Sequence, residues 1–268
     1  MLSLSERFDT AMKIFTIASI KGGSGKSTTA FNLGAALAAS GKKTLLIDLD
    51  PQANLTLWAQ ASDPGPLPLE MITDRRPLRD LVTSTNLDRL QICPASESLV
   101  FAPEELSAKR NRDSCLKTQI ETFRHGHNLP AYILIDTPPG FGILTRNALA
   151  AADAVIIPTA TQFLNLSGLI SFMAHLEEIQ EQLNPTLKVA GILLTRVDRR
   201  TRHAQEIANL TRKQYGKAVL RTEIRENVKL AESVSFGKPI FTYASTSHGA
   251  EDYKALTVEL LNNERRRR

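Results

Sequence analysis

Short apolar runs alternate along the chain with segments that have helical spacing. Five runs rich in Ile, Val and Leu have the length of buried strands: Ile14–Ile20, Thr44–Asp48, Tyr132–Asp136, Ala154–Pro158 and Val189–Thr195. Four segments between them have the length of helices: Ser27–Ser40, Glu104–His125, Leu166–Leu183 and Thr201–Tyr215. Strands that alternate with helices predict an α/β fold with a parallel sheet and right-handed crossovers.

Weaker patterns complete the predicted architecture. Further strands are expected at Leu90–Cys93, Val219–Glu223 and Ile240–Tyr243, and a last helix at Ala250–Asn262. No internal repeat is visible, and the Pro-rich stretch 64–68 is too short for a domain linker. We therefore expect one α/β domain over residues 13–262, with a mostly parallel, twisted sheet and helices on both faces. A leader of residues 1–12 precedes it, and a basic tail of residues 263–268 follows it.

A glycine-rich sequence, KGGSGKST, joins the first predicted strand to the first predicted helix. This context is typical of the phosphate-binding loop of P-loop NTPases. Gly22, Gly23 and Gly25 let backbone N–H groups approach phosphate oxygens without a Cβ in the way, and the helix N-terminus adds partial positive charge. Lys26 is expected to reach the β- and γ-phosphates, and the Ser27 hydroxyl to bind Mg²⁺.

Three aspartates follow predicted strands in two further stretches, LLIDLDPQANLT (45–56) and YILIDTPPGFG (132–142). Asp48 and Asp50 are two residues apart, so in an extended chain they point the same way. Asp136 has the position of a Walker-B aspartate, which holds Mg²⁺. All three are expected at the carboxyl edge of the sheet, where open α/β sheets bind ligands.

The three motifs together resemble those of the ParA/MinD family of deviant Walker A ATPases. Two later segments, LLTRVDRRT (193–201) and IRENVKLAESVSFGKPI (224–240), are similar to ParA segments. The resemblance therefore extends from Lys13 to about Leu261, and it is of the Soj-like type that lacks an N-terminal helix-turn-helix. It implies an ATPase that uses ATP and Mg²⁺ and forms a homodimer in which two subunits sandwich two ATP molecules.

The resemblance also assigns roles to residues of the loop and the aspartates. The usual loop has a glycine where Ile20 stands, and the family places a lysine at Lys21 that reaches the partner subunit's nucleotide, much as an arginine finger does. Lys21, Lys26 and Asp50 are implied as catalytic, with Asp50 positioning the attacking water. The implied nucleotide-binding set is Lys21, Gly22, Gly23, Ser24, Gly25, Lys26, Ser27, Thr28, Thr195 and Arg196, and the metal set is Ser27, Asp48 and Asp136.

Three positions depart from the common family pattern. Gly140 stands where many ParA proteins have serine, Ala53 stands where glycine is frequent, and Ser27 replaces the commoner threonine. None of these departures removes a catalytic group.

Charge is distributed unevenly along the chain. Residues 196–268 contain 16 Lys and Arg against 9 Asp and Glu, a net charge of +7, and the remainder carries −2. A basic region suggests a polyanion partner, although charge alone favours a solvated basic surface. The resemblance implies non-specific DNA as the polyanion, with cytoplasmic, nucleoid-associated localisation and a ParB-like partner that stimulates slow hydrolysis. The candidate DNA-binding residues are Arg200, Arg202, Arg221, Arg225, Lys229 and Lys238.

Other functions that use a similar loop stay open. A MinD-like ATPase ends in an amphipathic helix with bulky apolar residues, whereas LTVELLNNERRRR has few and no aromatic, so burial of this helix and no stable membrane insertion are expected. An iron–sulfur or metal-insertion ATPase needs a cysteine after the Walker-B strand, and residues 137–147 contain none. A small-molecule kinase needs a second pocket and a lid, which the sequence does not indicate. ParA-like ATPases that position other cargo share the same motifs.

Overall fold

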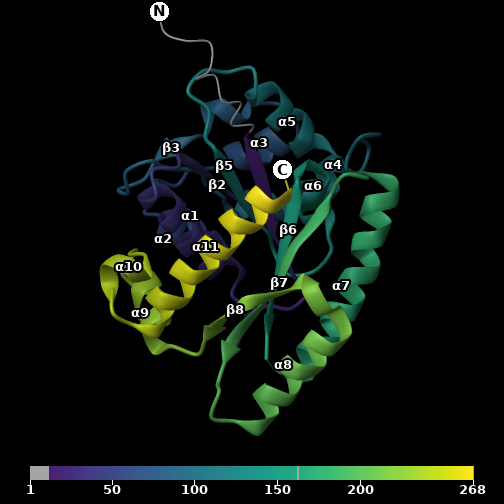
Figure 1. Ribbon diagram of the computed structural model, residues 1–268. Helices are drawn as coiled ribbons and strands as arrows, with labels where there is room; N and C mark the ends of the chain where they lie inside the picture. Colours follow the sequence, from purple (N-terminus) through teal and green to yellow (C-terminus); the bar gives the residue numbers. More distant parts are fainter. Residues whose placement is uncertain (1–11, 162, 268) are drawn as a thin grey trace, which may run out of the picture.

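The computed structural model describes residues 12–161 and 163–267. Its eight strands form one sheet in the order β3-β4-β2-β5-β1-β6-β7-β8. All neighbours pair in parallel except β3 and β4, which are antiparallel. The strands are β1 (Lys13–Ile17), β2 (Thr44–Asp48), β3 (Thr83–Ser84), β4 (Leu90–Cys93), β5 (Tyr132–Asp136), β6 (Ala154–Ala160), β7 (Lys188–Val197) and β8 (Val219–Arg225). The predicted mostly parallel α/β fold is confirmed (Figure 1).

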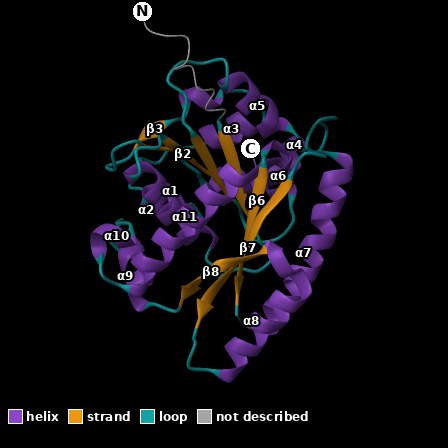
Figure 2. Cartoon of the chain, in the orientation of Figure 1, coloured by secondary structure: helices purple, strands orange, loops and turns teal. Residues whose placement is uncertain are grey.

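Helices cover both faces of this sheet (Figures 1 and 2). The described α-helices are α1 (Lys26–Ala39), α2 (Asn54–Trp58), α3 (Leu67–Ile72), α4 (Ala102–Leu106), α5 (Cys115–Phe123), α6 (Ile143–Ala151), α7 (Phe163–Gln182), α8 (Arg202–Tyr215), α9 (Val228–Ser235), α10 (Ile240–Tyr243) and α11 (His248–Arg267). Short 3₁₀ segments are η1 (Leu78–Asp80), η2 (Glu97–Phe101) and η3 (Gly216–Ala218). None of these described helices combines the length and apolarity needed to cross a bilayer.

The core divides into two apolar layers because side chains alternate along each strand. In β1, Ile14 belongs to the layer that α3 to α8 cover, whereas Phe15 and Ile17 belong to the layer under α1, α2 and α9 to α11. The central strand β2 is buried at all five positions. This two-sided burial explains why the strands read as continuous apolar runs rather than as alternating ones.

Helix α1 lies unusually close to the sheet. A Cβ added at Gly34 would come within 2.7 Å of Leu46 Cδ2 on β2, which is closer than packed atoms allow. The absence of a side chain at Gly34 therefore sets the depth at which α1 packs.

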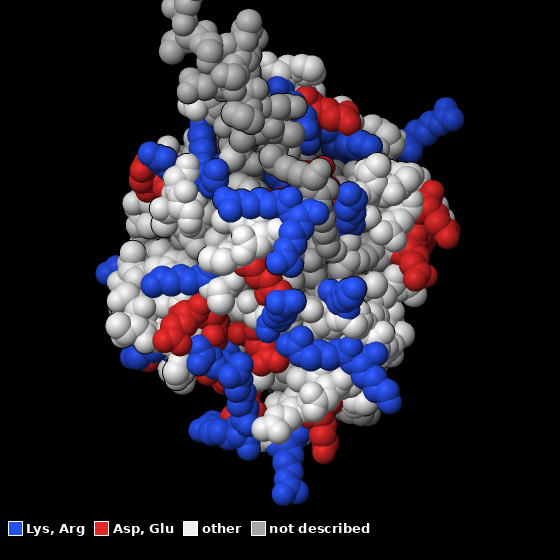
Figure 3. All heavy atoms as spheres, in the orientation of Figure 1, with Lys and Arg blue, Asp and Glu red and all other residues white. Residues whose placement is uncertain are grey.

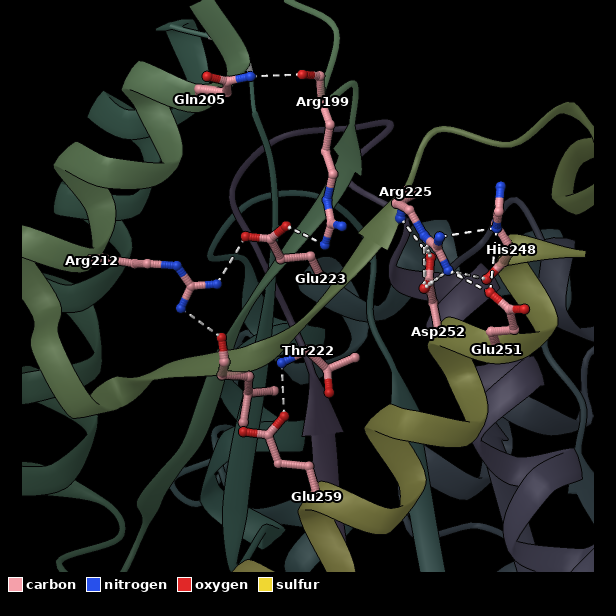
Figure 4. Close-up of polar contacts among 11 residues, drawn as sticks. Arg199, Gln205, Arg212, Thr222, Glu223, Arg225, His248, Glu251, Asp252 and Glu259 are labelled. Carbon is pink, nitrogen blue, oxygen red and sulfur yellow. Dashed lines mark hydrogen bonds and ion pairs between the residues drawn. The ribbon is translucent and has the colours of Figure 1, made fainter. Parts of the chain in front are cut away.

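Helix α11 covers the edge strand β8. The carboxylate of Glu259 accepts hydrogen bonds from the backbone N–H groups of Arg221 and Thr222, both at 2.8 Å. Asp252 accepts one from the N–H of Arg225 at 2.9 Å (Figure 4). Side chains of one helix thus occupy backbone donors that an edge strand otherwise leaves unpaired.

Two predicted elements are wrong. The expected helix Glu104–His125 is two helices, α4 and α5, because the polar stretch 107–114 between them forms turns, such as the bond from the Ser114 N–H to the Asn111 carbonyl. The expected strand Ile240–Tyr243 is helix α10. Its first N–H donates to Asn32 Oδ1 at 2.8 Å, and the Pro239 carbonyl accepts from Thr242 and Tyr243, so a local turn replaces strand pairing.

The structure describes little of the predicted leader and most of the predicted tail. The predicted leader 1–12 lies outside the described residues except for Met12, which is buried. Residues 263–267 of the predicted tail continue α11. Helices α2, α3, α6 and α9 and the short strand β3 were not predicted, since each is short.

Candidate functional site

The predicted site residues gather where β1, β2 and β5 end. These strands are neighbours, and their register places Ile17 beside Asp136 and Asp136 beside Asp48. The glycine-rich loop leaves β1 at this edge, and Asp50 follows two residues after β2. Parallel strands therefore bring together three sequence motifs, the first and last of which are more than 100 residues apart in the chain.

Hydrogen bonds within the loop from Ser19 to Gly25, from β7 and from the loop after β5 hold this loop in place. Inside it, the Ser19 and Ser24 hydroxyls hydrogen-bond at 2.6 Å. From β7, the Thr195 hydroxyl donates to the Ser24 carbonyl at 2.8 Å. From the loop after β5, the Gly140 N–H donates to the Ser19 carbonyl at 3.3 Å. These bonds fix the loop before any ligand is bound, which is the preorganisation that phosphate binding needs.

The glycines of the loop leave open space for a ligand. Gly23 and Gly25 have φ of +70° and +88°, values that favour glycine. A Cβ added at Gly22 or Gly23 would meet no atom within 4 Å. Helix α1 begins at Lys26, directly after this cradle, so its first N–H groups and its positive end face the same region. The geometry fits a bound phosphate chain.

Lys26 is a buried cation. Its side chain is 6% exposed, and its Nζ donates to the Lys21 carbonyl at 3.4 Å. Burial lowers the pKa of Lys26 from its ordinary value, while the negative charges of Asp136 and Asp50 act in the opposite direction. The ammonium group therefore lacks much of its water, a cost that the negative charge of a bound polyphosphate would offset.

Lys21 differs from Lys26 in being exposed. Its aliphatic stem crosses helix α7 at Gly168, where an added Cβ would lie 3.3 Å from Lys21 Cγ and 3.6 Å from Cε. Its carbonyl also accepts a hydrogen bond from the Ser19 hydroxyl at 3.3 Å. The backbone of Lys21 is thus part of the fixed loop, whereas its ammonium group is on the outside of the subunit.

Asp136 has the character of a metal-binding carboxylate. It is fully buried, its Oδ1 accepts the N–H of Thr137 at 3.1 Å, and its Oδ2 has no hydrogen-bond partner among the described residues. Burial raises the pKa of Asp136 well above its ordinary value, and the nearby Asp48 adds to this shift, while the Ser27 hydroxyl opposes it. A buried carboxylate oxygen that lacks a hydrogen-bond partner and lies beside a serine hydroxyl fits Mg²⁺. This ion is bound by few protein oxygens and keeps several waters.

Asp48 has a different environment, although it is equally buried. Its Oδ1 accepts the Asp50 N–H at 3.0 Å, and its Oδ2 accepts the N–H and the hydroxyl of Thr56 at 2.9 and 2.7 Å. Burial raises the pKa of Asp48 to about 6 despite these bonds. Both oxygens hold the loop 49–56 against β2. That Asp48 supports the metal stays a prediction. Because both of its oxygens already accept hydrogen bonds, Asp48 would act through neighbouring residues rather than through a free oxygen.

Asp50 lies at the start of this loop and is 7% exposed. Its Oδ1 accepts the Gln52 N–H at 3.0 Å, and its carbonyl accepts the Ala53 N–H at 2.8 Å. Ala53 has φ of +52°, a left-handed conformation in which glycine avoids the steric cost of a Cβ. This conformation explains physically why glycine is frequent there in the family that the sequence resembles.

The remaining predicted nucleotide-binding positions lie around the same loop. Thr28 is in the first turn of α1, and Thr195 touches the loop directly, as described above. Arg196 has φ of +51°, and its side chain pairs with Glu226 at 3.1 Å. From the sequence we assigned no role to Thr56, whose N–H and hydroxyl both donate to Asp48. Its hydroxyl, eight residues after Asp48 at the end of the same motif, was the available sign of this contact.

Comparisons with known proteins agree with this geometry. A family described as "AAA domain" matches residues 12–189. The chain is 38% identical to the chromosome partitioning protein ParA of Myxococcus xanthus, over 95% of this chain and 90% of that protein. It is also 38% identical to the sporulation initiation inhibitor protein Soj of Bacillus subtilis, over 94% and 99%. The chain belongs to the ParA/MinD family of ATPases.

Solved structures of related ATPases have the same fold. A cobyrinic acid a,c-diamide synthase from Mycobacterium smegmatis, with bound ATP analog and magnesium, is 29% identical, with a TM-score of 0.84 over 96% of this chain and 97% of that one. The septum site-determining protein MinD of Pyrococcus horikoshii, complexed with Mg-ADP, has a TM-score of 0.74 over 93% and 96%. Because that protein is 24% identical, it bears on the fold alone.

The raised pKa of Asp48 predicts a pH dependence of stability in this ParA/MinD-family chain. Its pKa in the folded state is about 6, against an ordinary value of 3.8, so between these pH values the unfolded state holds fewer protons and stability falls as pH rises. We expect the wild-type free energy of unfolding, minus that of Asp48→Asn, to fall by up to about 3 kcal/mol from pH 4 to pH 7. Urea unfolding at a series of pH values measures this difference.

Asp63→Asn, in an exposed loop, is the matched control and should give a curve parallel to the wild type. If the Asp48→Asn and wild-type curves were also parallel, the raised pKa would be wrong.

Proposed function

We propose that this chain is a ParA-type partition ATPase that forms a homodimer around ATP. The observation that carries the proposal is the pair of lysines in one fixed loop, with Lys26 buried toward the aspartates and Lys21 exposed on the outside. Among the described residues, the exposed side chain of Lys21 forms no ion pair within 4 Å. A second subunit facing this loop would bring a nucleotide phosphate to it, as the resemblance to ParA proteins implies.

ATP and Mg²⁺ suit the site that the residues form. The N–H groups of Gly22 to Gly25 and the first turn of α1 would hold the phosphates, with Lys26 at their terminal oxygens. Ser27 and the unmatched oxygen of Asp136 would hold Mg²⁺, which neutralises charge on the β- and γ-phosphates when bound. Asp50 would orient water for attack, as the resemblance to ParA proteins implies, since it is a buried carboxylate that follows β2 at this edge of the sheet.

The hydrolytic arrangement of a single subunit is incomplete in this proposal. Lys21 acts on the partner's nucleotide, so one subunit alone lacks a cation at its own γ-phosphate. Hydrolysis by the pure protein is therefore slow, and a ParB-like protein raises it by ordering the dimer. The dimer binds non-specific DNA in the cytoplasm, on the nucleoid, and the partner releases it after hydrolysis.

A MinD-like membrane role is less well supported by the last helix. Tyr253, Leu256 and Leu260 of α11 are buried in the core, and Leu261 is half-buried, which leaves Val258 as its large exposed apolar residue. An interfacial helix needs a continuous free apolar face to enter the lipid headgroups. Cargo other than DNA is the second candidate, since ParA-like ATPases that position other cargo share the motifs that the sequence shows.

Nucleotide dependence of DNA binding tests the proposed function. We expect a labelled non-specific duplex to be retained with a non-hydrolysable ATP analogue and not with ADP, because the dimer joins two weak surfaces into one footprint. Gel shifts in both nucleotides measure this. Equal affinity in the two nucleotides would contradict a ParA-type switch.

Lys21→Ala tests the cation in trans. The variant should bind ATP through Lys26 but should stay monomeric with ATP and lose hydrolysis, since the charge that meets the partner's nucleotide is gone. Light scattering and phosphate release measure the two properties. Lys42→Ala, another exposed lysine, is the control and should behave as wild type. A Lys21→Ala protein that dimerises and turns over normally would overturn the assignment.

Asp50→Ala separates binding from chemistry. The substitution removes the carboxylate that positions water but leaves the loop, Lys21 and Lys26 in place. We expect turnover to stop while ATP locks the protein as a dimer, which size-exclusion chromatography with ATP would detect. A monomeric Asp50→Ala protein in ATP would show that Asp50 serves assembly instead.

A further inference from the structure

A cavity of about 260 Å³ lies at the amino edge of the sheet, where β1, β6 and β7 begin. The first residues of these three strands line it, together with the last turns of α11 and with Arg124 at the end of α5. The phosphate loop leaves β1 at the other end of that strand. The cavity and the phosphate site are therefore at opposite edges of the sheet and share no residue.

Small side chains leave this space open. Ala154 on β6 pairs with Phe15 on β1, and both belong with Ala190 and Leu260 to the apolar layer under α11. The pairing of β6 with β7 passes over Ala190, which is thus an extra residue in β7. Two alanines stand where larger side chains would fill the end of the layer, so the core of the protein does not close at this edge.

The inner wall of the cavity is apolar. Phe15, Ala154, Ala190 and Leu260 line it and are buried. An engineered apolar cavity of about 150 Å³ is enough to bind benzene, so this larger space has room for a short alkyl chain or a substituted ring. Sites for small molecules commonly combine such a wall with a few polar groups that fix the orientation of the ligand.

Two cations at the cavity have no acid to neutralise them. Arg124 and Lys188 both line it and are exposed, and among the described residues neither forms an ion pair within 4 Å. Figure 3 shows lysine and arginine side chains around the C-terminal end of α11 on the face drawn. Other cations of the chain are held by its own acids: Arg200 by Asp198, Arg225 by Asp252, and Lys229 by Glu232.

The two acids in the lining are already bonded. Asp153 accepts the N–H of Ile14 at 2.8 Å and pairs with the ammonium group of Lys13 at 3.6 Å. Glu264 accepts the hydroxyl of Tyr132 at 2.8 Å, a bond that ties the end of α11 to β5. The charges left without a partner at the cavity are therefore positive, which favours an anion over a cation as the ligand.

We propose that this cavity binds a small organic anion that consists of a carboxylate and a short alkyl chain. The chain would lie against Phe15 and Leu260, where its burial removes apolar surface from water. The carboxylate would remain at the mouth and meet the side chains of Lys188 and Arg124 through charge-assisted hydrogen bonds. This site does not depend on the proposed function, because no group that would hold ATP takes part in it.

Three probes with the same chain and different head groups test the class of ligand. Octanoate is an anion, octan-1-ol is neutral, and octylammonium is a cation. By isothermal titration calorimetry with the full chain, we expect one octanoate per chain with a dissociation constant on the order of 0.1 mM. Octan-1-ol should bind more weakly and octylammonium weakest. Equal affinity for octanoate and octylammonium would show that the site does not select anions.

Two variants place the probe in the cavity. Arg124→Gln/Lys188→Gln removes both unpaired charges, and we expect it to weaken octanoate by about fivefold while changing octan-1-ol by less than about twofold. Lys42→Gln/Arg110→Gln removes two exposed cations outside the lining and should leave both affinities as in the wild type. Ala190→Leu fills part of the space and should weaken both probes by about tenfold or more. Thermal unfolding followed by circular dichroism reports whether each variant is folded.

Octanoate binding that neither the double cavity variant nor a folded Ala190→Leu protein weakens would place the probe elsewhere and overturn the cavity as its site. The leader supplies a second check, because Met12 lines the cavity and residues 1–11 precede it. If the full chain bound none of the three probes and a chain without residues 2–11 bound octanoate, the leader would be the occupant and the proposed ligand would be wrong.

Discussion

Burial of charge at the carboxyl ends of β2 and β5 is the constraint on which the rest of the site depends. A carboxylate or ammonium taken out of water costs several kcal/mol unless donors or counter-charges replace the water. Asp48 receives three donors from its own loop, which offset part of the cost of burying its charge. Asp136 and Lys26 are satisfied only in part. The unliganded subunit thus holds unfavourable electrostatics that a metal ion and phosphates would remove, and that removal is available as binding energy.

The fold supplies this constraint through the order of its strands. With β1 between β5 and β6, and β2 beside β5, the phosphate loop and both aspartate loops leave adjacent strand ends. Thr195 on β7 reaches the same loop, so four strands contribute to one small region. The sheet fixes where these loops begin, whereas the loops carry the groups that would bind phosphate and act on it.

The sequence was most informative where local pattern and burial coincide. Buried parallel strands are continuous apolar runs, and the glycine loop lies between strand and helix, so the sheet, the loop and its aspartates could be predicted. Short elements could not, because the run Ile240–Tyr243 is compatible with strand or helix, and its contact with Asn32 over 208 residues decides the outcome. Cation pairing was also beyond prediction, since Arg225 is neutralised by Asp252 and Glu251 on a helix that follows much later in the chain.

Helix α11 gives β8 an unusual kind of protection. An edge strand with free donors is a template on which another chain can add as a further strand. Glu259 and Asp252 occupy donors of β8, and the helix itself lies across the strand. Growth of the sheet from one copy into the next is therefore obstructed on this side. Two copies that meet through their phosphate loops form a self-complementary, closed pair, whereas strand addition at an open edge has no natural stopping point.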